Sequence, residues 1–362
     1  MTFQAPFPYF GGKSPVAPVV WQAFGDVPNY VEPFFGSGAV LLARPATHPW
    51  RNRTETVNDL DGMVANYWRA TQAAPDDVAR WADWPVNEND LHARHVWLVA
   101  RKPELQARLE GEPDWYDAKV AGWWLWGMCQ FIGSGWCSGE GPWQSVDGQL
   151  VRIGNDNDGI RRQRPHLGDG RGINRKRPHL GNDGRGINRK RPHLADDGMG
   201  INRQMVGYGD VSHTEVWSEH LRQMMRRLSD RLRRVRVCCG DWTRVCGPSP
   251  TVKNGVTGVF LDPPYSLDER SSGLYNYEND VADAVRTWAL EHGDDPLMRI
   301  VLCGYDGEHA MPASWRTYRW KTQGGYANEG EGRENATRET LWLSASCLQP
   351  DQQAALPLVE PA

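Results

Sequence analysis

The chain has 362 residues, of which 40% are hydrophobic and 24% are charged, an ordinary composition for a water-soluble globular protein. No apolar run is long enough to span a bilayer, and the N-terminus lacks a signal-peptide pattern, so we expect neither a membrane protein nor a secreted one. Seven cysteines without CxxC spacing indicate reduced thiols, and predict neither a zinc site nor a disulfide framework. The length allows one large domain with an insertion, or two domains.

The net charge of −4 conceals a basic segment. Residues 151–236 carry 20 Lys and Arg against 10 Asp and Glu, so the rest of the chain is strongly acidic. A basic segment in an acidic chain indicates a polyanionic partner that meets one region only. A solvated insert would have the same charge, and that alternative stays open.

The first 72 residues predict alternating strands and helices. Residues 30–34 and 55–58 predict short strands, and a Gly36-Ser37-Gly38 turn leads from the first strand into a helix that begins at Ala39. A helix is expected at 62–71. This alternation predicts a parallel α/β sheet.

After residue 74 the pattern changes to a stretch rich in Trp and Asp. We expect helices at 88–101 and 116–131, and the spacing of Trp123 and Trp126 favours a packed core helix.

An internal repeat follows. Arg-Pro-His-Leu begins at Arg164, Arg177 and Arg191, within a Gly- and Asp-rich segment, 154–204. The repeat units are too short and polar to build a core, so we predict a weakly ordered loop. Either this loop contacts phosphates non-specifically, or it is an expanded repeat that has no effect on function.

Periodic structure is expected again from Ser212–Thr214, which offer helix caps. The helix that follows carries arginines on one face, which either contact a polyanionic partner or form a solvated face: Arg222, Arg226, Arg227, Arg231, Arg233 and Arg234. The remaining elements are expected as strands at 235–239, 256–261 and 299–303, a helix at 278–292, a closing strand pair at 315–321 and 339–345, and a tail from 349.

The most specific motif is Asp262-Pro263-Pro264-Tyr265, directly after the predicted strand 256–261. Ligands of open α/β sheets bind beyond the carboxyl ends of the strands. A carboxylate, a carbonyl held by rigid prolines and an aromatic ring together suit a planar exocyclic amine. On its own, the motif would also fit a turn that covers the core.

Two further sites accompany this tetrad. The Gly36-Ser37-Gly38 turn lets backbone approach a ligand, and Asp59 ends the second strand, where an acid binds ribose hydroxyls. Together they favour a nucleoside site, although the turn is not a full dinucleotide fingerprint. Gly12-Lys13 does not fit a P-loop, but Lys13 can reach a ligand carboxylate, with Tyr9 as a flat wall.

The order of these motifs resembles that of the Dam-type adenine-N6 DNA methyltransferases, and in particular their phage or prophage members. The resemblance covers residues 5–72 and about 212–347 and depends on these segments: Tyr9-Phe10-Gly11-Gly12-Lys13, Glu32-Pro33-Phe34-Phe35-Gly36-Ser37-Gly38, Asn58-Asp59, Gly240-Asp241, Asp262-Pro263-Pro264-Tyr265 and Arg338-Glu339-Thr340-Leu341-Trp342.

The resemblance implies a Rossmann-like α/β fold and S-adenosylmethionine as the cofactor. Lys13 would lie near the cofactor carboxylate, Asp59 on its ribose and Asp241 beside its adenine. The other implied cofactor-binding residues are Tyr9, Glu32, Phe34, Gly36, Gly38 and Asp262. No metal is expected.

The implied catalytic residues are Asp262, Pro263, Pro264 and Tyr265. Asp262 and the Pro263 carbonyl would accept hydrogen bonds from the target amino group, and Tyr265 would stack on a flipped-out base. Related cytosine-N4 enzymes commonly have Ser in place of the acid, so Asp262 favours adenine. Cytosine-N4 methylation and a catalytically silent DNA-binding relative remain alternatives.

The implied organisation is a catalytic domain from residues 1–72 and 235–348, with an inserted, mainly helical target-recognition region, 73–234, that contains the flexible repeat 154–204; 349–362 form a tail. The expected partner is double-stranded DNA, with no obligate protein partner and no membrane. The expected setting is phage or restriction–modification DNA methylation in the cytoplasm of a bacterial host.

Overall fold

A computed structural model describes residues 3, 5–9, 12–45, 53–131, 136–137, 143–146, 149–152, 211–264, 275–320 and 339–349. The repeat segment 154–204 and Tyr265 lie outside the described residues, as do all but the first residue of the predicted tail.

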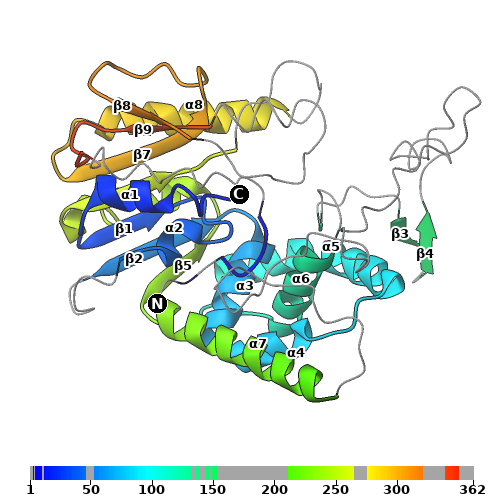
Figure 1. Cartoon of the computed structure of the whole chain (residues 1–362). Helices are drawn as coiled ribbons and strands as arrows, with labels where there is room; N and C mark the ends of the chain where they lie inside the picture. The colour runs from blue at the N-terminus through cyan, green and yellow to red at the C-terminus, as the bar shows by residue number, and fades with distance from the viewer. Residues whose placement is uncertain are drawn as a thin grey trace, which may run out of the picture.

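Seven strands of the described chain form one mixed sheet (Figure 1). They are β1 (Asn29–Glu32), β2 (Thr54–Asp59), β5 (Val235–Cys239), β6 (Thr257–Leu261), β7 (Met298–Tyr305), β8 (Arg316–Arg319) and β9 (Glu339–Leu343). Their order is β5-β2-β1-β6-β7-β9-β8, with the first five parallel and β9 antiparallel to both its neighbours. The predicted α/β class is confirmed.

The chain order of the strands reverses between β1 and β6. From β1 the chain moves outward through β2 and β5, then returns to the other side of β1 with β6 and β7. In doubly wound sheets this switch point opens a crevice at the carboxyl ends of the two central strands. The tetrad that follows β6 therefore begins at the switch point.

Helices lie on both sides of the sheet and beyond its edge. They are α1 (Ala17–Phe24), α2 (Ala39–Leu42), α3 (Gly62–Ala73), α4 (Pro75–Ala82), α5 (Glu88–Gly111), α6 (Ala118–Gln130), α7 (Val211–Leu232) and α8 (Tyr275–His292). Side chains cap three of them, since Asp61, Asn87 and Asp117 each accept a hydrogen bond from a backbone N–H in the first turn.

Alternation along the strands divides the core in two. Tyr30 and Phe260 belong to a cluster that includes α1 and α3, whereas their neighbours Val31 and Val259 pack in a second cluster with α8. The sheet is therefore buried on both faces, as a parallel sheet requires.

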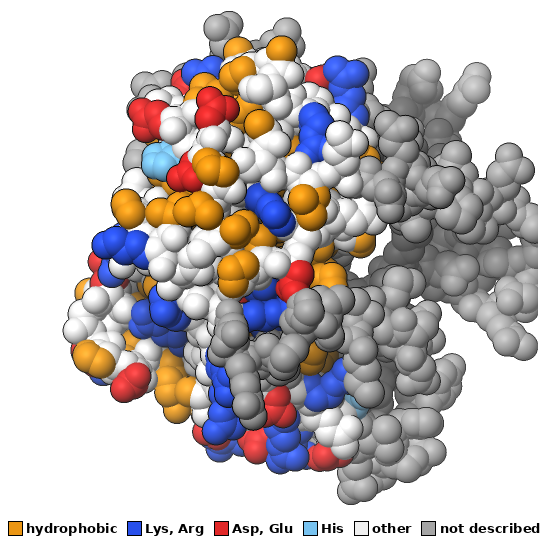
Figure 2. Space-filling view, turned by 90° about the vertical axis from the view of Figure 1, so that its left-hand side faces the viewer, with side chains coloured by type: hydrophobic (Ala, Val, Ile, Leu, Met, Phe, Trp, Pro, Cys, Tyr) orange, Lys and Arg blue, Asp and Glu red, His pale blue; other side chains and the backbone are white. Residues whose placement is uncertain are grey.

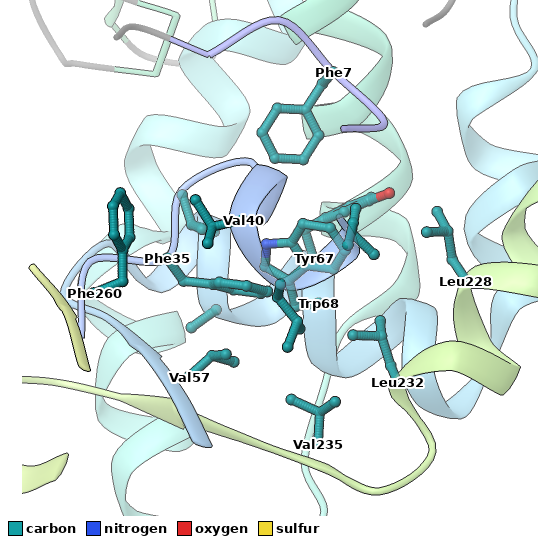
Figure 3. Packing of buried hydrophobic residues seen from close by; sticks show 14 of the residues in the cluster. Phe7, Phe35, Val40, Val57, Tyr67, Trp68, Leu228, Leu232, Val235 and Phe260 are labelled. Carbon is teal, nitrogen blue, oxygen red and sulfur yellow. The ribbon is translucent and has the colours of Figure 1, made fainter. Parts of the chain in front are cut away.

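The long connection from β2 to β5 contains α3–α7, and these helices share one hydrophobic core with the sheet. Figure 3 shows Tyr67 and Trp68 of α3 between Phe7 and Val57, with Leu228 and Leu232 of α7 alongside. Residues of α4, α5 and α6 join the same cluster through Val78, Leu98 and Trp124.

The structure also differs from the sequence-based expectations. Helices α1 and α4 were not predicted, and neither was the antiparallel pair β3 (Trp143–Val146) and β4 (Gln149–Arg152). Helix α5 continues past Pro103 to Gly111, because Leu105 and Leu109 bury against the core and packing overrides the local tendency to stop before proline. The predicted helix at 88–101 was therefore too short.

Arg231 contradicts its predicted place among the exposed arginines of α7. It is 7% exposed and pairs with Glu55 of β2 through two hydrogen bonds of 2.7 and 2.9 Å. Its position on the helix faces the sheet rather than solvent, so it has no role in contacting DNA.

Two surface features complete the fold. The face shown in Figure 2 mixes Lys and Arg with Asp and Glu around small hydrophobic groups, so this side has no extended basic surface among the described residues. Among the described helices, none is long and apolar enough to cross a membrane.

Candidate active site

The carboxyl edge of the sheet collects most of the acids singled out in the sequence. Glu32 ends β1, Asp59 ends β2, Asp241 follows β5 and Asp262 follows β6. Because these four strands are parallel neighbours, their carboxyl ends meet along one edge. Segments separated by up to 230 positions in the chain are thereby brought to one crevice.

Lys13 is the buried cation at this edge. Its Nζ lies 3.0 Å from Asp262 Oδ1 and 3.9 Å from Glu339 Oε2, and its side chain is 5% exposed. Burial is the largest single effect and opposes the charged form of Lys13, but the attractions of Asp262, Cys303 and Glu339 together outweigh it and raise the pKa of Lys13. Lys13 is therefore a fixed cation that connects the N-terminal segment to the tetrad.

Glu339 is a partner of this pair that the sequence did not single out. It begins β9, two strands away from β6, and is 5% exposed. In the sequence, Glu339 stood out only as part of the segment that resembles the last strand of the family. Its contact with Lys13 makes β9 part of the site.

The Gly36-Ser37-Gly38 turn needs its glycines. Gly36 has φ +47°, and a Cβ atom there would lie 2.8 Å from the ring of Tyr9. Gly38 has φ +67°, and a Cβ there would lie 2.9 Å from the ring of Phe35. Any residue other than glycine would be unfavourable at these two positions, because it would have to adopt a left-handed backbone conformation and its Cβ would clash with an aromatic ring.

Asp59 is held by the turn that it faces. Its Oδ2 accepts a 2.8 Å hydrogen bond from the Gly36 N–H, and its Oδ1 accepts one of 2.9 Å from the Asp61 N–H. Burial raises the pKa of Asp59 to about 7, although these two hydrogen bonds favour the ionised form. The carboxyl group is thus oriented beside the glycine turn and titrates near neutrality.

Glu32 is buried beneath the same turn. Its Oε2 accepts a 2.8 Å hydrogen bond from the Tyr30 hydroxyl. Burial raises the pKa of Glu32 well above its usual range, and the hydrogen bond from Tyr30 offsets only part of that rise.

Two rings lie near the carboxyl ends of β1 and β5. Phe34 stacks with Trp242, with ring centroids 6.3 Å apart and planes inclined by 29°. Asp241, just before Trp242, accepts a 3.0 Å hydrogen bond from the Thr243 N–H and so begins a short 3-10 helix, η2 (Trp242–Val245). Asp241 therefore has a structural task besides any ligand contact.

Asn58 is a positioning residue that the motif contained but that received no role. Its Nδ2 donates to the Pro33 carbonyl at 3.1 Å and to the Gly240 carbonyl at 2.8 Å. It thereby ties together the loops after β1 and β5, which carry Phe34 and Asp241. The only sign of this role in the sequence was the position of Asn58 directly before the acid that ends a strand.

The tetrad is described only in part. Asp262 is partly exposed, Pro263 is buried and Pro264 is exposed, whereas Tyr265 lies outside the described residues. In the N-terminal motif, Phe10 and Gly11 also lie outside them.

The residues of this edge fit S-adenosylmethionine, a cation that carries a sulfonium and an ammonium group. Asp262 and Glu339 face Lys13, and a positively charged ligand would favour the ionised forms of the buried Glu32 and Asp59, whose pKa values burial raises. The rings of Tyr9 and Phe35 lie directly against the glycines of the turn, and the Phe34–Trp242 pair adds a flat apolar surface, so aromatic rings surround the backbone of the turn. When bound, the cofactor supplies an activated methyl group. Among the described residues, no group of His, Cys, Asp or Glu has the geometry of a metal site.

Comparison with known families assigns the first part of the chain. Residues 9–95 match the model of the D12 class N6 adenine-specific DNA methyltransferases, a segment that contains Tyr9, Lys13, the glycine turn and Asp59. No curated protein matches the chain. The family uses S-adenosylmethionine and flips its target base, which agrees with the acid-lined switch point. Residues 9–95 thus resemble a D12 class N6 adenine-specific DNA methyltransferase domain, and this match supports S-adenosylmethionine-dependent methylation of adenine N6 in DNA.

Proposed function

We propose that this protein is a Dam-type, phage-like enzyme that methylates adenine N6 at one specific site in double-stranded DNA. The observation that carries the proposal is the 3.0 Å contact between Lys13 and Asp262 at the switch point of the sheet. It places the tetrad against the N-terminal motif, so the two halves of the proposed site adjoin.

On the cofactor side, Asp59 binds the ribose hydroxyls, and Gly36 and Gly38 let the turn wrap the methionine part. Tyr9, Glu32, Phe34 and Asp241 line the rest of this subsite. Lys13 lies near the cofactor carboxylate and at the same time holds Asp262.

On the target side, Asp262 and the Pro263 carbonyl accept hydrogen bonds from the adenine amino group. The amino lone pair is delocalised into the ring, and two acceptors that draw the hydrogens out of plane localise it toward the methyl group. Pro264 keeps this turn rigid, and Tyr265 stacks on the flipped base. The rate enhancement comes mostly from positioning.

The target-recognition region is residues 73–234, and the catalytic domain is 1–72 with 235–348. The enzyme works without an obligate protein partner, in the cytoplasm of a bacterial host, in a phage or restriction–modification setting. Support comes from the position of α4–α7 within the single connection between β2 and β5.

Transfer of tritiated methyl groups to unmethylated duplex DNA tests the proposal. We expect incorporation into N6-methyladenine at one short sequence, identified by sequencing with modified-base detection. Absence of incorporation on mixed-sequence duplex DNA contradicts methylation of double-stranded DNA, and incorporation without sequence preference contradicts site specificity.

The titration of Asp59 predicts how cofactor binding depends on pH. Asp59 is largely protonated at pH 6 and ionised at pH 8, and the ionised carboxylate is the better acceptor for two hydroxyls. The Kd for S-adenosylmethionine should fall up to roughly tenfold over this interval. Folding stability has the opposite dependence, because a raised pKa stabilises the folded state at low pH and that contribution is lost as the pH rises through about 7.

Calorimetry at a series of pH values provides the measurement, with Asp59→Asn as the control. That variant should bind more weakly and lose the part of the pH dependence that Asp59 causes, whereas Glu32, also with a raised pKa, keeps its own. An unchanged pH profile in Asp59→Asn rules out Asp59 as the titrating group.

A further inference from the structure

A cluster of tryptophans on the helices of the β2–β5 connection has no part in the methyl-transfer site. Arg94, Trp97 and Arg101 follow one face of α5 at i, i+3 and i+7, and α6 has a stripe of similar spacing. We call the following set the cation–tryptophan ladder: Arg94, Trp97 and Arg101 of α5, Lys119, Trp123 and Trp126 of α6, and Trp81 and Trp84 from α4 and the turn after it.

Cations and rings alternate within the ladder. Arg101 lies 3.9 Å from the ring centroid of Trp97, Lys119 lies 4.4 Å from Trp123 and 5.0 Å from Trp97, and Arg94 lies 4.4 Å from Trp126 and 4.7 Å from Trp123. Trp97 and Trp123 also meet edge to face at 4.9 Å. The rings therefore hold the cations in place.

Ring contacts do not neutralise these charges. In the part of the chain that the structure describes, Arg94, Arg101 and Lys119 make no ion pair, and their side chains donate no hydrogen bond. Arg94 is 5% exposed, and its buried Nη1 has no hydrogen-bond partner. A buried N–H without an acceptor is costly, and an oxyanion would supply one after a small shift of the neighbouring rings.

Arg108, on the same helix, shows that a ring contact does not by itself leave a cation unpaired. It lies 4.3 Å from the ring of Trp115, yet it also makes two 2.9 Å hydrogen bonds to Glu112. Among the described residues, cation–ring packing in the ladder thus occurs without an ion pair, although Asp90 accepts a 2.6 Å hydrogen bond from Trp84 Nε1 and attracts Arg94 at longer range.

We propose that the cation–tryptophan ladder contacts the phosphate backbone of the DNA substrate. Arg101 and Lys119 are half-buried, so phosphates can reach them, and Trp84, half exposed, extends the surface. Lys102, next to Arg101, lies 3.5 Å from Asp61, two residues after Asp59, which brings α5 to the edge of the sheet where the site lies. The inference rests on the proposed action on duplex DNA.

Steady-state methylation kinetics with Arg101→Gln and Lys119→Gln test this role, with Arg108→Gln as the matched control. Each ladder variant should raise the KM for duplex DNA roughly 3- to 10-fold and lower the slope of log KM against log salt by about one, as expected for one lost phosphate contact. The kcat and the Kd for S-adenosylmethionine should stay unchanged, and Arg101→Lys should restore most of the loss. Arg108→Gln should behave as wild type.

Two outcomes overturn the inference while wild type remains active. Unchanged KM and salt slope in both ladder variants would mean that the ladder serves packing only. An equal rise in KM for Arg108→Gln would mean that the effect is not specific to the unpaired cations. Absence of methyl transfer by wild type instead contradicts the proposed function itself.

Discussion

Replacing Asp262 by Asn should lower kcat for methyl transfer by roughly 10²- to 10³-fold, the loss typical of one misplaced electrostatic group at a reacting centre. The amide keeps one acceptor oxygen but loses the charge and presents N–H groups to the target amine. It also takes the closer of two carboxylates away from Lys13, while Glu339 stays at 3.9 Å. Asp262→Ala, which removes both oxygens, should reduce transfer to background.

The measurement is tritium transfer at saturating DNA and cofactor, combined with the urea midpoint of each variant. Asp26→Asn is the control, because Asp26 pairs with Arg53 at the opposite, amino edge of the sheet. The control should keep full activity. A D262N protein that folds and transfers methyl groups at the wild-type rate would show that Asp262 does not hold the target amine.

A double-variant cycle separates positioning from chemistry. If Lys13 acts by holding Asp262, Lys13→Gln should lower kcat, and the double variant Lys13→Gln/Asp262→Asn should be little worse than D262N alone. Additive losses would assign Lys13 an independent role, such as contact with the cofactor carboxylate.

Replacing Glu55 by Gln should destabilise the protein by about 3–5 kcal/mol, the cost of breaking a buried ion pair on one side. Glu55 is 4% exposed and pairs with Arg231 through both carboxylate oxygens, at 2.7 and 2.9 Å. It also accepts a 2.9 Å hydrogen bond from Arg44. The neutral amide would remove the negative charge that lies between two buried guanidinium groups, so their mutual repulsion would no longer be offset by Glu55.

This network attaches α7 to β2 and to the end of α2, since Arg231 also donates to the Leu41 carbonyl at 3.0 Å. Urea unfolding gives the change in stability, and hydrogen exchange should show faster opening of α7. Glu112→Gln is the control, because it breaks an ion pair with Arg108 that solvent already screens, and its midpoint should not move measurably. An unchanged midpoint in Glu55→Gln would contradict a structural role for the network.

The five parallel strands were predictable because each is short and contains β-branched residues, which favour extended backbone. The expected strands at 55–58 and 235–239 fall within or on β2 and β5. Asp59, at the end of β2, and Asp262, directly after β6, were recognised by position, whereas Glu32 came only from the family resemblance. Patterns in the local sequence failed to predict structure where tertiary packing determines it. The helix expected at 88–101 ends before Pro103, yet α5 continues to Gly111 because its next turns bury leucines in the core.

By itself, the sequence determined the order of the motifs, the α/β class and the acids at the strand ends, because these depend on residues close together in the chain. Only the tertiary structure decided which distant groups meet. Lys13 and Asp262 are 249 positions apart and Glu55 and Arg231 are 176 apart, so no periodicity or spacing reports either pair. The same holds for the ladder: the stripes on α5 and α6 are visible in the sequence, but only the way the two helices dock brings their cations onto the tryptophan rings without an ion pair among the described residues. Contacts of this kind follow from packing of the whole core, in which each side chain's partner depends on all the others.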